Sequence, residues 1–238
     1  MWFFPKNTTI KESGILEGFV DFHCHLLPGV DDGIQKMSET LHVLRIWEEY
    51  KVKEIWLTPH IMEDYPNQPE DLAIVFEELL RQYHGSIKLH LSAENMMDNI
   101  FTQRKEEKKM LPLGHAKNHI LVETSYLNPP YGLEQILFDT KVKGYVPILA
   151  HPERYQYMNI NDYKKLKEKN IKFQLNIPSL IGAYGQTAKQ KAEMLLDKEF
   201  YEFCGTDTHS LKFVKYFLEG KLANKRIKQV EKIISTNS

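Results

Sequence analysis

Short apolar segments alternate regularly with amphipathic ones, and this feature most constrains how the chain can fold. Seven segments have the length and apolar content of buried strands, namely residues 19–23, 54–58, 87–92, 120–123, 146–150, 171–176 and 200–205. Between them, residues 72–80 carry apolar side chains at helical spacing, and the T-x-x-Q pattern of residues 187–190 predicts that a helix begins there. The alternation predicts an α/β fold with parallel strands joined by helices.

Length and charge exclude several classes of protein. The chain has 238 residues, enough for one α/β domain, and 31 basic side chains balance 32 acidic ones, which is unlike a nucleic-acid-binding protein. It has no stretch of about 18 uncharged apolar residues that could span a membrane. We expect residues 1–18 to form an N-terminal arm whose apolar start, Met1–Pro5, packs on a single domain of residues 19–238. The segment after Leu211 is predicted to be a helical tail with a solvated basic face.

Polar side chains of metal-binding type follow nearly every predicted strand. Six of the seven strands end in or just before such a residue, and these residues are His23, His25, His60, Glu94, Glu123, His151, Asp207 and His209. In a barrel of alternating strands and helices the carboxyl ends of the strands meet on one face, where such folds carry their active sites. The sequence therefore predicts one metal site at that face.

Each of these signals is weak when it is taken alone. A lone His-x-His pair is as often structural as functional, Asp31-Asp32-Gly33 is a usual turn sequence, and His60 could be a satisfied polar group at a strand end. Glu94 and Glu123 are stronger signals, because a carboxylate that ends an apolar strand is costly to bury without a cation or hydrogen bonds. Because nearly all these residues lie at the ends of predicted strands, we favour a metal site over separate structural roles. The other histidines lack such placement and are interpreted as structural or surface residues: His42, His84, His90, His115 and His119.

The composition of this ligand set indicates its chemistry. Imidazoles and carboxylates without a thiolate favour Mn²⁺, Fe²⁺, Zn²⁺ or Mg²⁺, and so many ligands predict two or three ions with Glu94 as a bridge. Neighbouring cations activate water and hold phosphoryl oxygens, so phosphate esters can be hydrolysed without a covalent intermediate. Arg154 is the candidate phosphate-binding side chain; the alternative is that it pairs with a nearby acid such as Glu153.

Other hydrolase mechanisms find no support in the motifs. A cysteine-dependent phosphatase needs an arginine six residues after its nucleophile, but Val30 and Ser210 occupy those positions after Cys24 and Cys204. The chain also lacks a G-x-S-x-G elbow, a P-loop and a G-x-G-x-x-G sequence. Two cysteines cannot build a disulfide framework, which fits a cytoplasmic protein. Strand alternation predicts that Cys24 points into the barrel wall and takes no part in the chemistry.

Taken in order, the motifs resemble those of a known family. Residues 21–33, DFHCHLLPGVDDG, resemble the opening of the polymerase and histidinol phosphatase (PHP) superfamily, and most of all its bacterial manganese-dependent tyrosine-protein phosphatases of the CpsB/CapC type, from capsule and exopolysaccharide systems. The likeness continues through residues 58–60, 93–94, 122–123, 151–155, 174–176, 182–185 and 206–209. Asn95 and Thr208 differ from the family pattern. Both lie beside expected ligands, so we expect these differences to affect the shape of the pocket more than catalysis.

The resemblance implies a distorted seven-stranded (β/α)7 barrel with three metal ions, most often Mn²⁺. It assigns the ligands to three sets: His23, His25, Glu94 and Asp207; then Glu94, Glu123 and His151; then Asp32, His60 and His209. Arg154 would bind phosphate, and Asp32 or His209 could protonate the leaving phenolate. The implied partner is a tyrosine-phosphorylated protein, a bacterial tyrosine kinase that controls polysaccharide assembly.

Two alternatives stay open. One is a small-molecule phosphatase on the same scaffold, acting on histidinol phosphate or a nucleotide. The other is a metal-bound interaction module without activity. An open rim would favour a protein substrate, and residues 100–110, with Arg104, Lys105, Lys108 and Lys109, are expected to contribute to that rim.

Overall fold

The computed structural model describes residues 7–107 and 109–236, so the apolar start Met1–Pro5 and Lys108 lie outside the described residues. All seven predicted strands are present. They are β2 (Val20–Cys24), β3 (Glu54–Leu57), β5 (Lys88–Leu91), β7 (His119–Glu123), β8 (Val146–Ala150), β9 (Lys172–Asn176) and β10 (Phe203–Gly205). The observed bounds differ from the expected ones by at most a few residues, because β-branched and aromatic side chains bounded by polar turns mark strands well.

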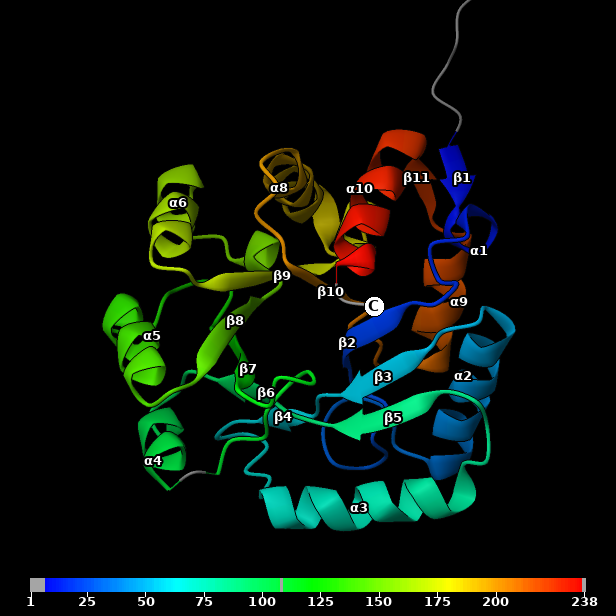
Figure 1. Cartoon of the computed structure of the whole chain (residues 1–238), viewed down its shortest axis with the longest axis horizontal. Coiled ribbons are helices and arrows are strands. Elements are labelled where there is room, and N and C mark those ends of the chain that lie inside the picture. Colours follow the sequence, from blue (N-terminus) through cyan, green and yellow to red (C-terminus); the bar gives the residue numbers. More distant parts are fainter. Residues whose placement is uncertain (1–6, 108, 237–238) are drawn as a thin grey trace, which may run out of the picture.

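The strands form two parallel sheets that curl around a common interior. One sheet has the order β10-β9-β8-β7-β6-β4 and the other the order β2-β3-β5, where β4 (His60–Ile61) and β6 (Glu94–Met96) follow β3 and β5 closely in the chain. The amide of Ser92 donates to Leu57 O and the amide of Glu94 to Pro59 O, so hydrogen bonding continues across both breaks. The result is a mixed α/β fold with a curled, parallel half-barrel sheet, with helices on its outside (Figure 1).

Strands β10 and β2, at the outer edges of the two sheets, lie side by side. The amide of Asp207 donates to His23 O at 2.7 Å, and the amide of His25 donates to Thr208 O at 2.9 Å. Cys24 and Thr208 form an isolated parallel bridge. These bonds bring residues that are far apart in sequence, at the ends of β2 and β10, into direct contact.

Alternation along the strands divides the core in two. Val20 and Phe22 of β2, with Leu121 of β7 and Ile148 of β8, belong to a small cluster inside the curl. Their neighbours in sequence face the outer core that the helices cover; Ile120, next to Leu121, is fully buried there. Because successive side chains of a strand point to opposite faces, one strand can serve both cores.

Helices cover the outer face of the sheets. They are α2 (Met37–Glu49), α3 (Pro69–Gln82), α4 (Phe101–Glu106), α5 (Leu133–Val142), α6 (Ile160–Glu168), the short α7 (Ile177–Leu180) and α8 (Gly185–Asp197). The helix predicted around residues 72–80 is α3, which buries Leu72 and Leu79. The helix predicted to begin at residues 187–190 is α8, but it begins at Gly185 and has no side-chain cap, so the T-x-x-Q pattern forms no capping box. A capping box is found instead on α6, between Asn159 and Asp162.

The start of the described chain pairs with a strand that precedes the last helix. After α9 (Leu211–Glu219), β11 (Lys221–Ala223) pairs antiparallel with β1 (Asn7–Thr9), which precedes the short α1 (Ile10–Ser13). The last helix, α10 (Asn224–Ser235), carries the basic residues of the predicted tail, and Arg226 pairs with Asp197 on α8. Among the described residues, no helix is long and apolar enough to cross a membrane.

Candidate metal centre

The carboxyl ends of the strands bring all nine predicted ligand residues into one cluster. At its centre the Nε2 atoms of His23 and His25 lie 3.2 Å apart. Glu94 Oε2 lies 3.2 Å from His23 Nε2 and 3.4 Å from His25 Nε2, and Asp207 Oδ1 lies 3.4 Å from both. Two donors of one tetrahedral ion, each bonded at about 2.0–2.1 Å, lie about 3.3–3.4 Å apart. The spacing of these donors therefore fits a metal ion.

Two further side chains orient the histidines. The ring N–H of His23, at Nδ1, donates to Gln174 Oε1 at 2.7 Å, and that of His25 donates to Asp31 Oδ2 at 2.7 Å. With Nδ1 protonated, each neutral imidazole turns the lone pair of Nε2 toward the cluster. Support of this kind is usual for metal-binding histidines. The sequence alone predicts no role for Gln174, and the family resemblance implies Asp32, not Asp31, as a ligand.

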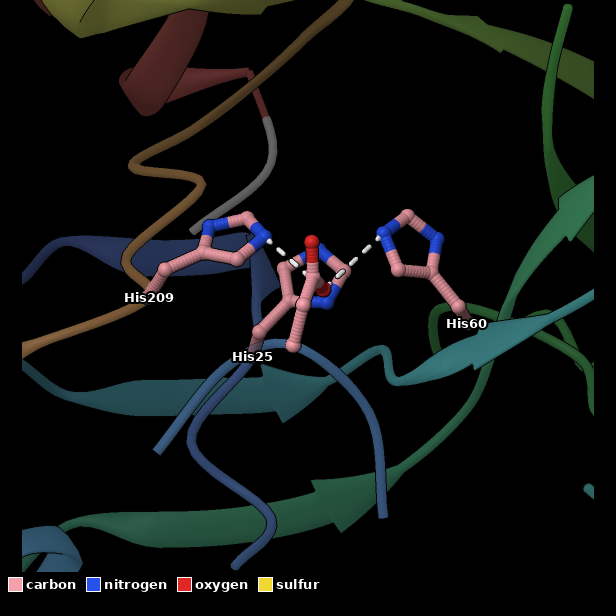
Figure 2. A group of neighbouring side chains, drawn as sticks. His25, His60 and His209 are labelled. Carbon is pink, nitrogen blue, oxygen red and sulfur yellow. Dashed lines mark ion pairs between the residues drawn. The ribbon is translucent and has the colours of Figure 1, made fainter. Parts of the chain in front are cut away.

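A second part of the cluster surrounds His60. Its Nε2 atom lies 3.5 Å from Asp32 Oδ1, which is also 3.6 Å from His209 Nε2. Figure 2 shows His60 and His209 reaching toward each other from opposite sides, with His25 between them. The Asp32 side chain is half exposed and that of His209 is partly exposed, so this part of the cluster is open to solvent.

The other side of His60 faces two buried carboxylates. His60 Nδ1 lies 3.0 Å from Glu123 Oε1 and 3.3 Å from Glu94 Oε2. The geometry makes no hydrogen bond, and within the described part of the chain neither His60 Nδ1 nor Glu123 Oε1 has any hydrogen-bond partner. Leaving buried polar atoms unpaired is costly. Such atoms, converging from different strands, fit a cation as their missing partner.

His151 completes the cluster from the end of β8. Its Nε2 atom lies 2.9 Å from Glu94 Oε1 and 3.9 Å from Glu123 Oε2. His151 and Asp207 both have positive φ, 32° and 51°, a region that residues other than glycine seldom adopt. Strained backbone of this kind concentrates at functional sites. Here it turns both side chains toward the cluster immediately after their strands.

Charges within the cluster hold each other in place. Burial lowers the pKa of His23, but the carboxylates of Glu94 and Asp207 outweigh it and raise that pKa to about 9. For Glu94 the balance is reversed: burial raises its pKa, and His23 and the other imidazoles bring it well below the usual range. Glu94 thus stays ionised while His23 and His25 hold protons. Metal binding requires neutral imidazole and ionised carboxylate ligands, so a divalent cation would replace those protons.

Two glycines allow the close packing beneath the cluster. A Cβ atom at Gly33 would lie 2.2 Å from His25 O, and one at Gly205 would lie 2.5 Å from the His23 Cβ atom. Both distances are far below a van der Waals contact. Asp21 also supports this region, since its carboxylate accepts hydrogen bonds from the amides of His23 and Thr206. Burial raises the pKa of Asp21 to about 6 despite these bonds.

Arg154 lies at the edge of the cluster. Its NH1 group donates to Asp207 Oδ2 at 2.7 Å, and its guanidinium lies between the rings of Tyr126 and Tyr184, 4.4 and 4.1 Å from their centroids. The alternative pairing with Glu153 is not observed, because Glu153 accepts from Asn176 N and from the Tyr201 hydroxyl. Arginine is therefore held beside the candidate ligands by a carboxylate and two aromatic faces.

A cavity of about 630 Å³ opens next to this arginine. Among the residues that line it are Tyr126, Arg154, Tyr184, Thr187 and Lys191. The expected contribution of residues 100–110 to the rim is wrong for two members, because Arg104 and Lys105 are buried. Arg104 instead pairs with Asp98 at 3.1 Å.

Neither cysteine is placed for catalysis. Cys24 and Cys204 are free thiols in the core, and burial raises the pKa of both. Thr208, one of the departures from the family pattern, is buried, and its hydroxyl bonds that of Thr206 at 2.7 Å. Asn95, the other, donates to the carbonyls of Ala93 and Leu121. Both departures therefore make structural hydrogen bonds behind the cluster.

The five histidines interpreted as structural or surface residues differ in their surroundings. His42 and His84 are exposed, and His119 packs edge-on against Phe203. His90 and His115 do not fit that interpretation, since both side chains contact Glu54 at the amino-terminal end of the strands.

Comparison with known proteins gives a consistent result. The family described as "Capsular polysaccharide synthesis, CpsB/CapC" matches residues 19–229. The tyrosine-protein phosphatase YwqE of Bacillus subtilis (strain 168) is 29% identical over 199 residues, which cover 81% of this chain and 78% of YwqE. The putative tyrosine-protein phosphatase CapC of Staphylococcus aureus is 25% identical over 217 residues, covering 88% and 84% of the two chains.

A solved structure shares the fold. It comes from a crystallographic study of YwqE from Bacillus subtilis and CpsB from Streptococcus pneumoniae, described as unique metal-dependent tyrosine phosphatases. The superposition has a TM-score of 0.72 at 24% identity and covers 92% of this chain and 95% of that chain.

Proposed function

The chain belongs to the CpsB/CapC family of capsular polysaccharide synthesis, and on that premise we propose that it is a metal-dependent protein-tyrosine phosphatase. One observation carries the proposal: donor atoms from separate strands converge at metal-ligand spacing, with Arg154 bonded to one of the same side chains. Relatives named as tyrosine-protein phosphatases, YwqE and CpsB among them, support the choice of phosphotyrosine over a metabolite.

We assign nine side chains as metal ligands: His23, His25, Asp32, His60, Glu94, Glu123, His151, Asp207 and His209. Among the described residues, the largest set whose donor atoms all lie within 4.8 Å of one another is His25, Asp32, His60 and His209. Bound divalent ions would supply a water of lowered pKa and positive charge for the phosphoryl oxygens. We propose Mn²⁺ as the ion, since mixed carboxylate and imidazole donors suit it; Fe²⁺, Zn²⁺ and Mg²⁺ are the competing choices.

The remaining chemistry belongs to three side chains. Arg154 would bind the phosphate through the N–H groups that Asp207 does not occupy, since its fork suits phosphate oxygens. Asp32 and His209 line the exposed side of the cluster, where either could hold a proton for the leaving phenolate. A phenol has a pKa near 10, so the leaving group needs little help from an acid.

The shape of the site supports a protein substrate. Asp32 and His209 reach the surface, and the cavity beside Arg154 is open to solvent on one side. A tyrosine side chain on a protein can reach such a mouth, whereas a small metabolite is usually enclosed. We propose that the substrate is a phosphorylated bacterial tyrosine kinase of polysaccharide synthesis. Two free, buried thiols support a reducing cytoplasmic location.

We also propose that the two parallel sheets form one distorted, seven-stranded barrel. The continuous hydrogen bonds across the β3–β4 and β5–β6 breaks, and the bonds between the ends of β2 and β10, support that count. In this proposal residues 19–238 are one catalytic domain, and residues 1–18 are an arm. The pairing of β1 with β11 supports an arm attached to the last part of the domain.

One set of assays tests the function. Metal content is measured, together with hydrolysis of p-nitrophenyl phosphate, a tyrosine-phosphorylated peptide and histidinol phosphate, with and without chelator. We expect chelation to abolish activity, Mn²⁺ to restore it, and the peptide to turn over faster than histidinol phosphate. Activity that survives chelation would refute the metallophosphatase proposal. Faster turnover of histidinol phosphate would favour the small-molecule alternative.

Arg154→Ala tests the phosphate-binding role, with Arg81→Ala as the matched control, because Arg81 is exposed and pairs only locally with Glu78. A hydrogen bond to a charged group contributes about 1.5–3 kcal/mol. We therefore expect kcat/KM for the phosphopeptide to fall by about 10- to 150-fold, with metal content unchanged. Loss of metal in Arg154→Ala would mean that its main role is to hold Asp207.

A further inference from the structure

A second group of potential ligands lies at the opposite end of the strands. Glu54 is the first residue of β3, and His90 lies on the adjacent strand β5. His115 belongs to the segment that connects α4 to β7. Glu54 Oε2 lies 3.1 Å from His90 Nε2 and 2.9 Å from His115 Nε2, so two imidazoles from different segments converge on one carboxylate oxygen.

The three residues have the geometry of a metal site with one open position. Their donor atoms all lie within 4.8 Å of one another. Glu54 is buried, His90 is partly buried and the side chain of His115 is 68% exposed. Two imidazoles and one carboxylate are the ligands of many zinc sites that keep a fourth position for water. The exposed side of His115 would leave that position facing solvent.

Surrounding contacts hold this arrangement in place. The His90 ring stacks on Trp56 with centroids 4.4 Å apart, and the His115 ring meets the edge of Trp56 at 5.7 Å. Lys53 approaches Glu54, but from the other carboxylate oxygen, at 3.7 Å from Oε1. Oε2 therefore stays directed at the two histidines.

We propose that Glu54, His90 and His115 bind one further divalent cation, separate from the candidate metal centre. Imidazole-rich sites with a single carboxylate favour borderline ions such as Zn²⁺, Co²⁺ or Ni²⁺. The donor set differs from the main cluster, in which carboxylates are as prominent as imidazoles. The proposal stands without the proposed activity, because it concerns only what these three side chains bind.

Such an ion would have a structural role, because it would hold separate segments of the chain together. The segment of His115 also places Leu113 in the interior apolar cluster, and Leu113 N donates to His119 O at 2.7 Å. An ion would tie this segment to β3 and β5 at the amino-terminal mouth of the curled sheet. In barrels of strands and helices that end serves stability, whereas the opposite end serves catalysis.

Counting ions tests the proposal. Wild-type protein, His115→Ala and the control His84→Ala are equilibrated with Co²⁺, freed of excess ion and measured for cobalt per chain. His84 is another exposed histidine and does not belong to the group of Glu54, His90 and His115. We expect His115→Ala to hold one ion fewer than wild type and His84→Ala to hold the same number. Equal cobalt in all three proteins would overturn the proposal.

Tryptophan fluorescence tests whether the ion that His115→Ala fails to bind lies beside Trp56. Co²⁺ quenches nearby indoles, and Trp56 is stacked on one proposed ligand. We expect Co²⁺ to quench wild type and His84→Ala, and to quench both His115→Ala and Trp56→Phe less strongly. Glu54→Gln, which keeps the shape of the side chain, should lose the same ion as His115→Ala. Undiminished quenching in His115→Ala would place the bound ion elsewhere and refute the site.

Discussion

The substitution Asp31→Asn tests whether the metal centre depends on a side chain that is not itself a ligand. Asp31 Oδ2 accepts from His25 Nδ1 at 2.7 Å and from the amide of His60 at 3.0 Å, while Oδ1 accepts from the amide of Gly33 at 2.9 Å. Burial raises the pKa of Asp31, but His25 and these hydrogen bonds outweigh it, so that pKa lies below the usual range and the group is ionised at neutral pH.

Asparagine can replace only part of this arrangement. With its oxygen directed at His25 and His60, its amide nitrogen faces the N–H of Gly33, and that buried donor loses its partner at a cost of about 1–3 kcal/mol of folding free energy. The bond to His25 also loses its charge. Removing such support from a metal-binding histidine weakens metal affinity by about 10- to 100-fold, or about 1.4–2.7 kcal/mol.

Calorimetric titration with Mn²⁺ measures this effect directly. The control is Asp64→Asn, which makes the same change at an exposed carboxylate outside the candidate ligand groups. We expect the dissociation constant to rise by about 10- to 100-fold in Asp31→Asn and to remain at the wild-type value in Asp64→Asn. If both variants bound Mn²⁺ as tightly as wild type, Asp31 would not orient His25 and the assignment of the ligands would be unsound.

Two further predictions concern packing and stability. Gly205→Ala places a methyl group 2.5 Å from the Cβ atom and 2.9 Å from the amide nitrogen of His23, so His23 must shift. We expect lower metal content and a lower melting temperature, and a variant with wild-type values for both would contradict that packing. Asn159→Ala removes the capping box of α6. It should lower the unfolding free energy by about 1 kcal/mol in a denaturant titration and leave hydrolysis unchanged; an altered turnover rate would show that α6 is coupled to the site.

Local properties of the sequence were enough to find the strands and most of the polar residues at their ends. The apolar runs before His23, Glu94 and Glu123 mark strands, and the cost of burying a charge singles out the carboxylates. Both signals, the apolar run and the buried charge, depend only on residues that are close in sequence. The prediction of a cluster needed one more assumption, that parallel strands end at the same face, and the structure brings the nine residues together there.

Only the tertiary structure decided how these residues pair. Arg154 bonds Asp207 rather than the adjacent Glu153, and His60 lies closer to Glu123 than His151 does. Gln174 reaches His23 across 151 positions of sequence. Such pairings follow from strand register and from how the two sheets meet, which no local pattern encodes. For the same reason His90 and His115 looked like ordinary histidines until the fold brought both to Glu54.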